Sequence, residues 1–176
     1  VMKYLLISDT HGQLEKTRNL ILQYPLMDGY FHMGDVGFAL SYLEQFHIVR
    51  GNHDRHTSLP MELRFTLGER KVLCMHGNRF DEETVQELLH MQHLSGEEMM
   101  EECMRRLYEK LSDYTKRQGC DTLFFGHTHE QCCVEYEGVT LINPGSLSFG
   151  MNGAGYAIVE IEGKHIHAEM KTLPNL

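Results

Sequence analysis

Acidic residues, histidines and one asparagine stand directly after short apolar segments at several points along the chain. The set consists of Asp9, His11, Asp35, Asn52, His53, Asp54, His76, His127 and His129. Each is a metal-ligand type or an acid or base. In a locally extended segment, residues two apart point the same way. We therefore expect Asp9 with His11, and His127 with His129, each to offer two ligands from one loop.

The donor atoms in this set indicate the kind of ion that it would bind. Imidazole nitrogen and carboxylate or amide oxygen, without thiolate, suit Mn, Fe, Zn, Co or Ni rather than a sulfur-rich structural zinc site. The set holds more donors than one ion takes from protein while keeping a position open. Two ions that share a carboxylate fit the number of donors.

The elements that must position these residues follow from the apolar pattern. In the N-terminal third, the apolar segments "KYLLIS", "GYFHM" and "FHIV" alternate with helical stretches, one of which reaches Gln45. This alternation predicts an α/β fold whose sheet is covered on both faces, with ligands bound at the carboxyl ends of strands. Residues 64–76 predict two strands around a turn at 67–70. Further strands are expected at "LFF", "CCVEY" and "VTLIN", and in a final hairpin turning at Gly163.

Between these strands, residues 81–118 change to a helical period. They predict two helices, the second beginning with a capping box of Ser95 and Glu98. This segment directly follows the loop of His76. We expect it to serve as a lid or as a contact between copies in a homo-oligomer.

Composition narrows the function classes. The 176 residues, 41% of them hydrophobic, suit a single domain spanning 1–176. A net charge of -9 argues against stable nucleic-acid binding, and the apolar runs are too short to cross a membrane. The five cysteines form no CxxC pair, and no signal-peptide pattern is present at the start. These features predict reduced thiols and a cytoplasmic protein.

Five short motifs in order carry a resemblance to a known family. "DTH", "GD", "GNHD", "HG" and "GHTH" each follow an apolar segment, and their arrangement resembles the calcineurin-like metallophosphoesterase superfamily. The short chain and "NPGS" at 143–146 make it similar to the small bacterial and archaeal phosphodiesterases of the YfcE family. The resemblance implies an αββα sandwich of two mixed sheets flanked by helices, with 81–118 as a helical elaboration of the domain.

The resemblance also implies a dinuclear metal centre. One divalent transition-metal ion would be held by Asp9, His11 and His129, and a second by Asn52, His76 and His127. Asp35 would bridge them. Manganese is the first choice for both ions, with Zn, Fe, Ni or Co as alternatives. Such a pair shares a hydroxide, lowers its pKa and clamps the phosphoryl oxygens of a phosphate ester during in-line attack.

Further residues are expected to contact the substrate. The resemblance places His53 near the leaving group as a general acid or phosphate contact, with Asp54 as its orienting partner. Asn52, Asn78 and Arg79 are expected to join His53 in binding the substrate. Ser146 of "NPGS" is a weaker candidate at the mouth of the site.

The expected function is metal-dependent hydrolysis of a small phosphate ester, most simply a phosphodiester. A phosphomonoesterase or a nucleotide pyrophosphatase is the alternative, because the ligands do not distinguish them. The run "GDVGFAL" lacks the Asp-Arg-Gly that follows Gly-Asp in the related serine/threonine protein phosphatases, which disfavours that lineage. A non-enzymatic alternative is a metal-binding scaffold, like the retromer subunit of this superfamily. That scaffold lacks the histidine of "GNHD", so His53 favours catalysis.

The remaining histidines are expected to be structural or exposed to solvent, because none lies in a motif. They are His32, His47, His56, His90, His93, His165 and His167.

Overall fold

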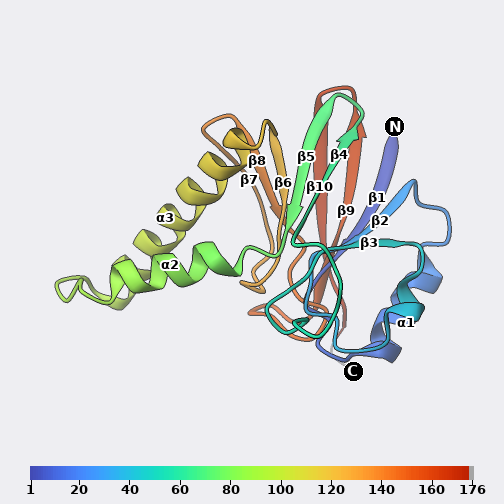
Figure 1. The fold of residues 1–176 in the computed structure, drawn as a ribbon, viewed down its shortest axis with the longest axis horizontal. Helices are drawn as coiled ribbons and strands as arrows, with labels where there is room; N and C mark the ends of the chain where they lie inside the picture. The colour runs from blue at the N-terminus through green and yellow to red at the C-terminus, as the bar shows by residue number, and fades with distance from the viewer. Residues whose placement is uncertain (175–176) are drawn as a thin grey trace.

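A computed structural model describes residues 1–174 as two stacked five-stranded sheets with helices outside them (Figure 1). The first sheet has the order β10-β9-β1-β2-β3, and the second β4-β5-β6-β8-β7. The first comprises β1 (Met2–Ile7), β2 (Gly29–His32), β3 (Phe46–Ile48), β9 (Gly155–Glu162) and β10 (His165–Thr172). The second comprises β4 (Glu62–Leu67), β5 (Arg70–Met75), β6 (Thr122–Phe124), β7 (Cys132–Tyr136) and β8 (Val139–Asn143).

Both sheets are mixed, as the family resemblance implied. The strands β1, β2 and β3 are parallel, and β9 pairs antiparallel with β1 and β10. In the second sheet β5, β6 and β8 are parallel, with β4 and β7 antiparallel at the edges. Each sheet therefore sends the carboxyl ends of three parallel strands to one edge, where their loops can meet.

The core has three layers, because each sheet is apolar on both faces. Leu6, Phe31 and Val159 of the first sheet pack with Val72 and Phe124 of the second in the layer between the sheets. The outer face of the first sheet is covered by α1 (Leu14–Gln23), whose Leu20 is buried in a second layer. The outer face of the second sheet is covered by α3 (Gly96–Arg117).

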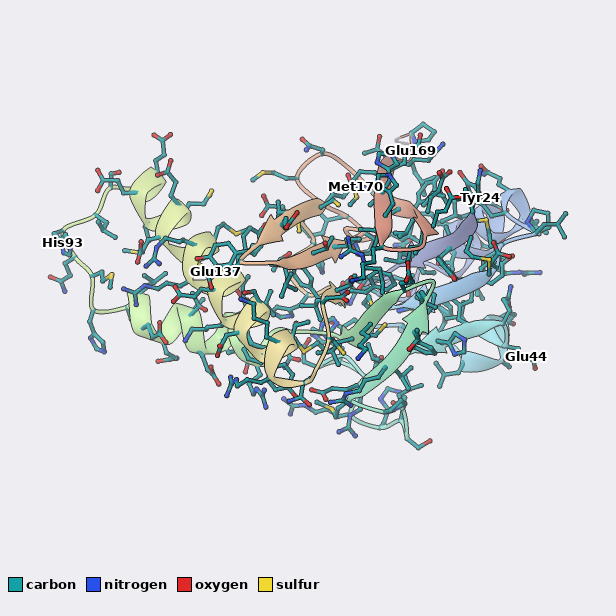
Figure 2. The ribbon with its side chains drawn as sticks, turned by 90° about the horizontal axis from the view of Figure 1, so that it is seen from above. Tyr24, Glu44, His93, Glu137, Glu169 and Met170 are labelled. Carbon is teal, nitrogen blue, oxygen red and sulfur yellow. The ribbon has the colours of Figure 1, made fainter. Side chains whose placement is uncertain are left out.

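The helices α2 (Asn78–Leu88) and α3 form a hairpin that projects beyond the sheets in both views (Figures 1 and 2). The amide of Glu98 donates to the Ser95 side chain at 3.2 Å, which confirms Ser95 as the N-cap of α3. His93 lies at the tip of the hairpin, exposed as expected (Figure 2). The C-terminal half of α3 packs on the second sheet through Leu107 and Leu111.

Two sequence-based boundaries differ from the structure. The helical stretch expected before Gln45 is only a short 3₁₀ helix, η1 (Leu40–Leu43), because Gly34, Gly37 and Asp35 adopt positive φ and keep residues 34–37 in a loop. The helical elaboration begins at Asn78 rather than at residue 81.

None of the described helices is long and apolar enough to span a membrane. The five cysteines are unpaired, in agreement with the expectation of free thiols.

Candidate metal centre

The loops that follow the parallel strands bring most of the sequence-predicted ligands to one edge of the sandwich. Asp9 and His11 follow β1, Asp35 follows β2, and His76 and His129 follow β5 and β6. The loops are tied together by backbone hydrogen bonds, including Asp9 N to Gly34 O at 2.9 Å and His11 N to Asp35 O at 3.0 Å. The two sheets therefore supply one shared site.

The ligand loops have an uncommon backbone conformation. Among residues 1–174, six residues other than glycine have positive φ, and five of these are predicted ligands. They are Asp9, His11, Asp35, His127 and His129. The ligand segments are therefore left-handed and not extended as expected, although Asp9 and His11 still meet in one group of possible ligands. Such conformations are costly and concentrate at functional sites.

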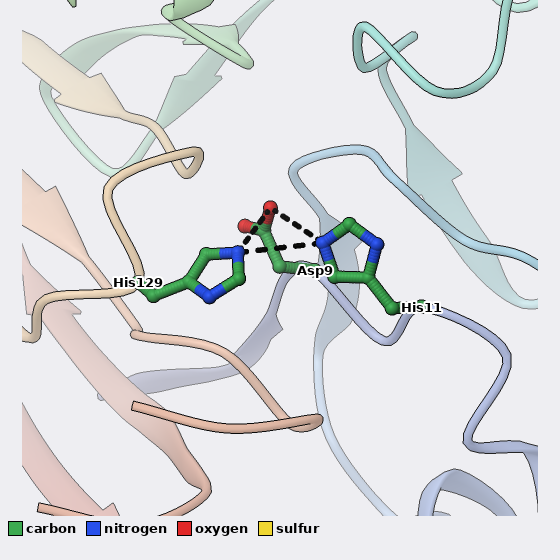
Figure 3. A group of neighbouring side chains, drawn as sticks. All are labelled: Asp9, His11 and His129. Atoms are coloured by element: carbon green, nitrogen blue, oxygen red, sulfur yellow. Dashed lines mark hydrogen bonds and ion pairs between the residues drawn. The ribbon is translucent and has the colours of Figure 1, made fainter. Parts of the chain in front are cut away.

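The first cluster joins ligands from the two sheets. The Nε2 atom of His129 lies 3.3 Å from Asp9 Oδ1, and that of His11 lies 3.6 Å from the same oxygen. The two Nε2 atoms are 3.3 Å apart. Figure 3 shows the imidazoles facing each other across the Asp9 carboxylate. This is the set expected for the first ion, and its atoms lie close enough together to hold one.

The second cluster contains Asp9, Asp35 and His76, all buried. Asp35 Oδ2 lies 3.3 Å from Nε2 of His76 and 3.7 Å from Nε2 of His11. It therefore reaches ligands expected for both ions, which is the position that a bridging carboxylate requires. His76 Nε2 is 3.8 Å from Asp9 Oδ1, so the two clusters share the Asp9 carboxylate.

Unpartnered polar atoms test whether this set fits a metal. In residues 1–174, four buried side-chain nitrogen or oxygen atoms lack a hydrogen-bond partner, and three of them are Asp9 Oδ1, Asn52 Oδ1 and His76 Nε2. The second polar side-chain atom of Asp9 and of His76 does have a hydrogen-bond partner. Ser8 Oγ donates to Asp9 Oδ2 at 2.5 Å, and His76 Nδ1 donates to Met33 O at 2.6 Å. An unpaired buried polar atom is costly unless a ligand satisfies it. These residues fit metal ions.

The electrostatics of the cluster favour cations. Burial alone would raise the pKa of the Asp9 carboxyl, but His11, His129 and His76 outweigh it and hold that pKa far below its usual range. Burial would also raise the pKa of Asp35, but His76 and His53 outweigh it and lower that pKa. The pKa of His76 is raised because the two carboxylates outweigh its burial. The buried carboxylates thus favour positive charge in this cluster, which metal ions would supply.

Comparisons with known proteins agree with this geometry. The model of the calcineurin-like phosphoesterase superfamily domain matches residues 2–164. The chain belongs to the calcineurin-like phosphoesterase superfamily. It is 28% identical over 166 residues to the probable metallophosphoesterase YsnB of Bacillus subtilis, covering 92% of this chain and 85% of that relative.

Solved structures with this calcineurin-like phosphoesterase fold come from several organisms. A predicted phosphoesterase from Streptococcus pneumoniae has a TM-score of 0.75 at 23% identity, covering 97% of this chain and 89% of that one. An archaeal phosphodiesterase has a TM-score of 0.62 at 19% identity, covering 97% and 100%. Vps29 of Entamoeba histolytica, complexed with zinc, has 0.65 at 20% identity, covering 97% and 98%. At these identities the likeness shows the fold alone.

The residues of the "GNHD" motif take different roles in the structure. Nδ1 of His53 lies 2.8 Å from Asp35 Oδ2, and its side chain is 65% exposed at the rim of the site. Asp54, expected to orient His53, instead accepts from the backbone amides of Asp35, Val36 and Gly51 at 2.7, 3.1 and 2.8 Å. The buried Asp54 carboxylate therefore has a structural role, because its two oxygens accept hydrogen bonds from three backbone N–H groups.

The sequence-predicted residues beyond His76 line a hollow of about 190 Å³ beside that imidazole. Asn78 and Arg79 form its wall together with Arg50 and Phe80. The Arg79 guanidinium stacks 4.6 Å from the Phe80 ring centroid, which holds it at the opening. A second hollow, of about 360 Å³, is lined by His127, His129, Phe149 and Met151.

Ser146 anchors the rim of that second hollow. Its hydroxyl donates to Asp9 O at 2.7 Å and accepts from the amides of Ser148 and Phe149. The Phe149 ring, 68% exposed, packs edge-on against His129 with centroids 5.6 Å apart. The weak candidate Ser146 thus supports the loop that carries an exposed aromatic ring next to a predicted ligand.

His127 and Asp81 form a contact that sequence reasoning missed. His127 lies outside the two clusters described above, with its ring 5.2 Å from that of His76, and its Nε2 lies 3.1 Å from Asp81 Oδ2. Asp81 belongs to no motif, and an acid in the first turn of a helix is common for helix-dipole reasons alone. No signal in the sequence distinguishes it from Glu82 or Glu83.

His32 is buried beneath the site, and its hydrogen bonds require the neutral form of its imidazole. Its Nδ1 accepts from the Gly34 amide at 3.0 Å, and its Nε2 lies 3.0 Å from Thr10 Oγ1, which donates onward to Val36 O. Protonation of Nδ1 would remove the acceptor for Gly34. Burial lowers the pKa of His32 to about 4. His32 is therefore structural, as the sequence indicated, and it supports the loop of Asp35.

This histidine predicts an acid sensitivity of the metal-free protein. The pKa of His32 is lower in the folded than in the unfolded protein, so its contribution to the free energy of unfolding is complete above about pH 6.5 and is lost as pH falls toward 4. The loss amounts to about 3 kcal/mol. We expect the free energy of unfolding, measured with urea from pH 7 to pH 4, to fall more steeply for the wild type than for His32→Gln. Glutamine keeps a donor and an acceptor but does not titrate. Equal slopes would contradict this role.

Proposed function

We propose that the chain is a dinuclear metal-dependent phosphodiesterase that hydrolyses a small phosphate ester. The observation that carries this proposal is the position of Asp35 Oδ2, within 3.7 Å of Nε2 of both His11 and His76, one from each expected ligand set. Unpartnered atoms of Asp9, Asn52 and His76 support the same reading. Two divalent ions held there, manganese being the first choice, would supply an activated water and stabilise phosphoryl charge.

The protein residues then position and protonate the substrate. Because Nδ1 of His53 is held by Asp35, its Nε2 is the nitrogen left for the substrate, on a side chain that is mostly exposed. An imidazolium there can donate a proton to the leaving oxygen or contact a phosphoryl oxygen. Arg79, with Arg50 in the same hollow, can pair with an oxygen that is not in the scissile bond.

The two hollows favour a diester over a monoester. One contains His76 and the other contains His127 and His129, so each hollow borders expected metal ligands. A phosphodiester has an organic group on each side of phosphorus, whereas a monoester has one. Phe149 and Met151 in one hollow, and Phe80 and Met75 in the other, offer apolar surface to such groups.

Unpaired cysteines support a reducing compartment such as the cytoplasm for this activity.

The test compares two chromogenic esters after reconstitution with manganese. We expect hydrolysis of bis-p-nitrophenyl phosphate to exceed that of p-nitrophenyl phosphate, and His53→Ala to lower kcat for the diester by about a hundredfold. His56→Ala is the matched control, because His56 is an exposed histidine in the same loop. A preference for the monoester, or for a nucleoside diphosphate or triphosphate, would replace the diesterase by a phosphomonoesterase or nucleotide pyrophosphatase.

A scaffold function makes the opposite prediction. A protein that uses this fold only for binding would turn over none of these substrates while two ions are bound. Full activity of His53→Ala would leave the phosphoesterase in place and remove His53 from its mechanism.

A further inference from the structure

The helical hairpin begins at one predicted ligand and reaches back to another. His76 directly follows the strand β5, Gly77 is the N-cap of α2, and Asp81 lies in the first turn of that helix. The Asp81 carboxylate points to the loop after β6, where its Oδ2 lies 3.1 Å from Nε2 of His127. In residues 1–174, His127 is the one side chain within hydrogen-bonding or ion-pairing distance of this carboxylate.

We propose that Asp81 is a positioning residue for the metal centre, acting through His127. By accepting the Nε2 proton it fixes the tautomer of the imidazole, so that Nδ1 keeps the free electron pair that an ion needs. The Asp81 carboxylate also makes Nδ1 of His127 a stronger metal ligand, because its negative charge stabilises the metal-bound imidazole. The inference rests on the proposed two-ion site.

The arrangement has a counterpart on the neighbouring ligand. Nδ1 of His76 donates to Met33 O, which leaves Nε2 of His76 unpartnered and buried. Each of these two imidazoles thus has one nitrogen held by the protein and one left over. His76 uses the neutral carbonyl of Met33 in the loop after β2, whereas His127 uses a charged group supplied by α2.

The hairpin holds Asp81 firmly enough for this purpose. The next residue toward the N-terminus, Phe80, is buried with Leu107 and Leu111 of α3, and Thr84 one turn later is also buried. Glu87 of α2 pairs with Arg106 of α3 at 3.2 Å and with Lys110. The hairpin therefore supports a carboxylate against the metal centre, which is a more specific role than the lid or oligomer contact expected from the sequence.

The experiment measures metal binding rather than turnover. Manganese or zinc is titrated by calorimetry into the metal-free wild type, Asp81→Asn, Asp81→Ala and Glu83→Gln. We expect the wild type to bind two ions, and Asp81→Ala to bind one of them about ten- to a hundredfold more weakly while the other is unchanged. Asparagine is nearly isosteric and can still accept the Nε2 proton, so its loss should be smaller. Glu83→Gln removes the same charge from the same helix and should match the wild type.

Cobalt provides a spectroscopic readout of the same site. Asp81→Ala is expected to alter the visible absorption of one of the two bound cobalt ions, with thermal unfolding of the metal-free variant showing that it folds. Two ions bound with wild-type affinity in Asp81→Ala would overturn the inference, and so would a wild type that binds fewer than two. Two ions bound by a wild type that hydrolyses no ester would end the proposed function and leave the role of Asp81 intact.

Discussion

Replacing Asp35 by asparagine is expected to lower kcat/KM by about a thousandfold or more and to abolish binding of at least one ion. The Oδ2 atom of Asp35 lies 3.7 Å from Nε2 of His11 and 3.3 Å from Nε2 of His76, and the carboxyl is ionised because the neighbouring imidazoles hold its pKa low. Asparagine offers a neutral oxygen in its place. A charge interaction worth several kcal/mol in the transition state corresponds to a rate factor of about this size.

The same variant separates metal binding from folding. Ligands stabilise the state that binds them, by about 2.7 kcal/mol at a hundred times the dissociation constant, so manganese should raise the wild-type Tm. For Asp35→Asn we expect little or no such rise, measured by thermal unfolding with and without the ion. Glu44→Gln removes a negative charge at an exposed position and should keep the full rise. Undiminished activity of Asp35→Asn with two bound ions would refute the bridging assignment.

The clustering of Asp9, His11, Asp35 and His129 could be predicted from the motifs because each ligand loop is local in sequence. Each ligand loop directly follows a strand, and the parallel strands of one sheet send such loops to the same edge, so "DTH" could be placed with "GD", and "HG" with "GHTH", before any coordinates. The N-cap at Ser95 and the turn before Arg70 are likewise encoded by neighbouring residues. Both were located correctly.

The features that sequence reasoning missed depend on contacts between distant segments. Asp81 meets His127 only because α2 packs against α3 and turns one face toward another loop. The left-handed backbone of Asp9 or His129 is imposed by surrounding hydrogen bonds and not by the residue itself, since neither is a glycine. The role of Asp54 was misjudged for the same reason, because its partners are amides of residues 35 and 36 in a different loop.

Asp54→Ala is expected to destabilise the protein by about 4 kcal/mol, although this side chain is not expected to touch a metal ion. The side chain is 2% exposed and accepts three backbone N–H groups, two of them from the loop of Asp35 and one from Gly51. Each donor left unpaired in the interior costs about 1 to 3 kcal/mol, part of which water can recover in the vacated space. Asp54→Asn keeps one accepting oxygen and should lose about half as much.

Urea unfolding of the metal-free variants at neutral pH measures these losses, with Asp113→Ala as the control. Asp113 is an exposed acid paired with Arg117 at 3.2 Å, and removal of such a surface pair costs about 0.5 kcal/mol or less. Because Asp54 joins the loop of Asp35 to the loop of Asn52 and His53, its loss should also weaken metal binding in proportion to the loss of stability. A variant Asp54→Ala that unfolds like the wild type and binds both ions, yet is inactive, would restore the role first expected for Asp54 as the orienting partner of His53.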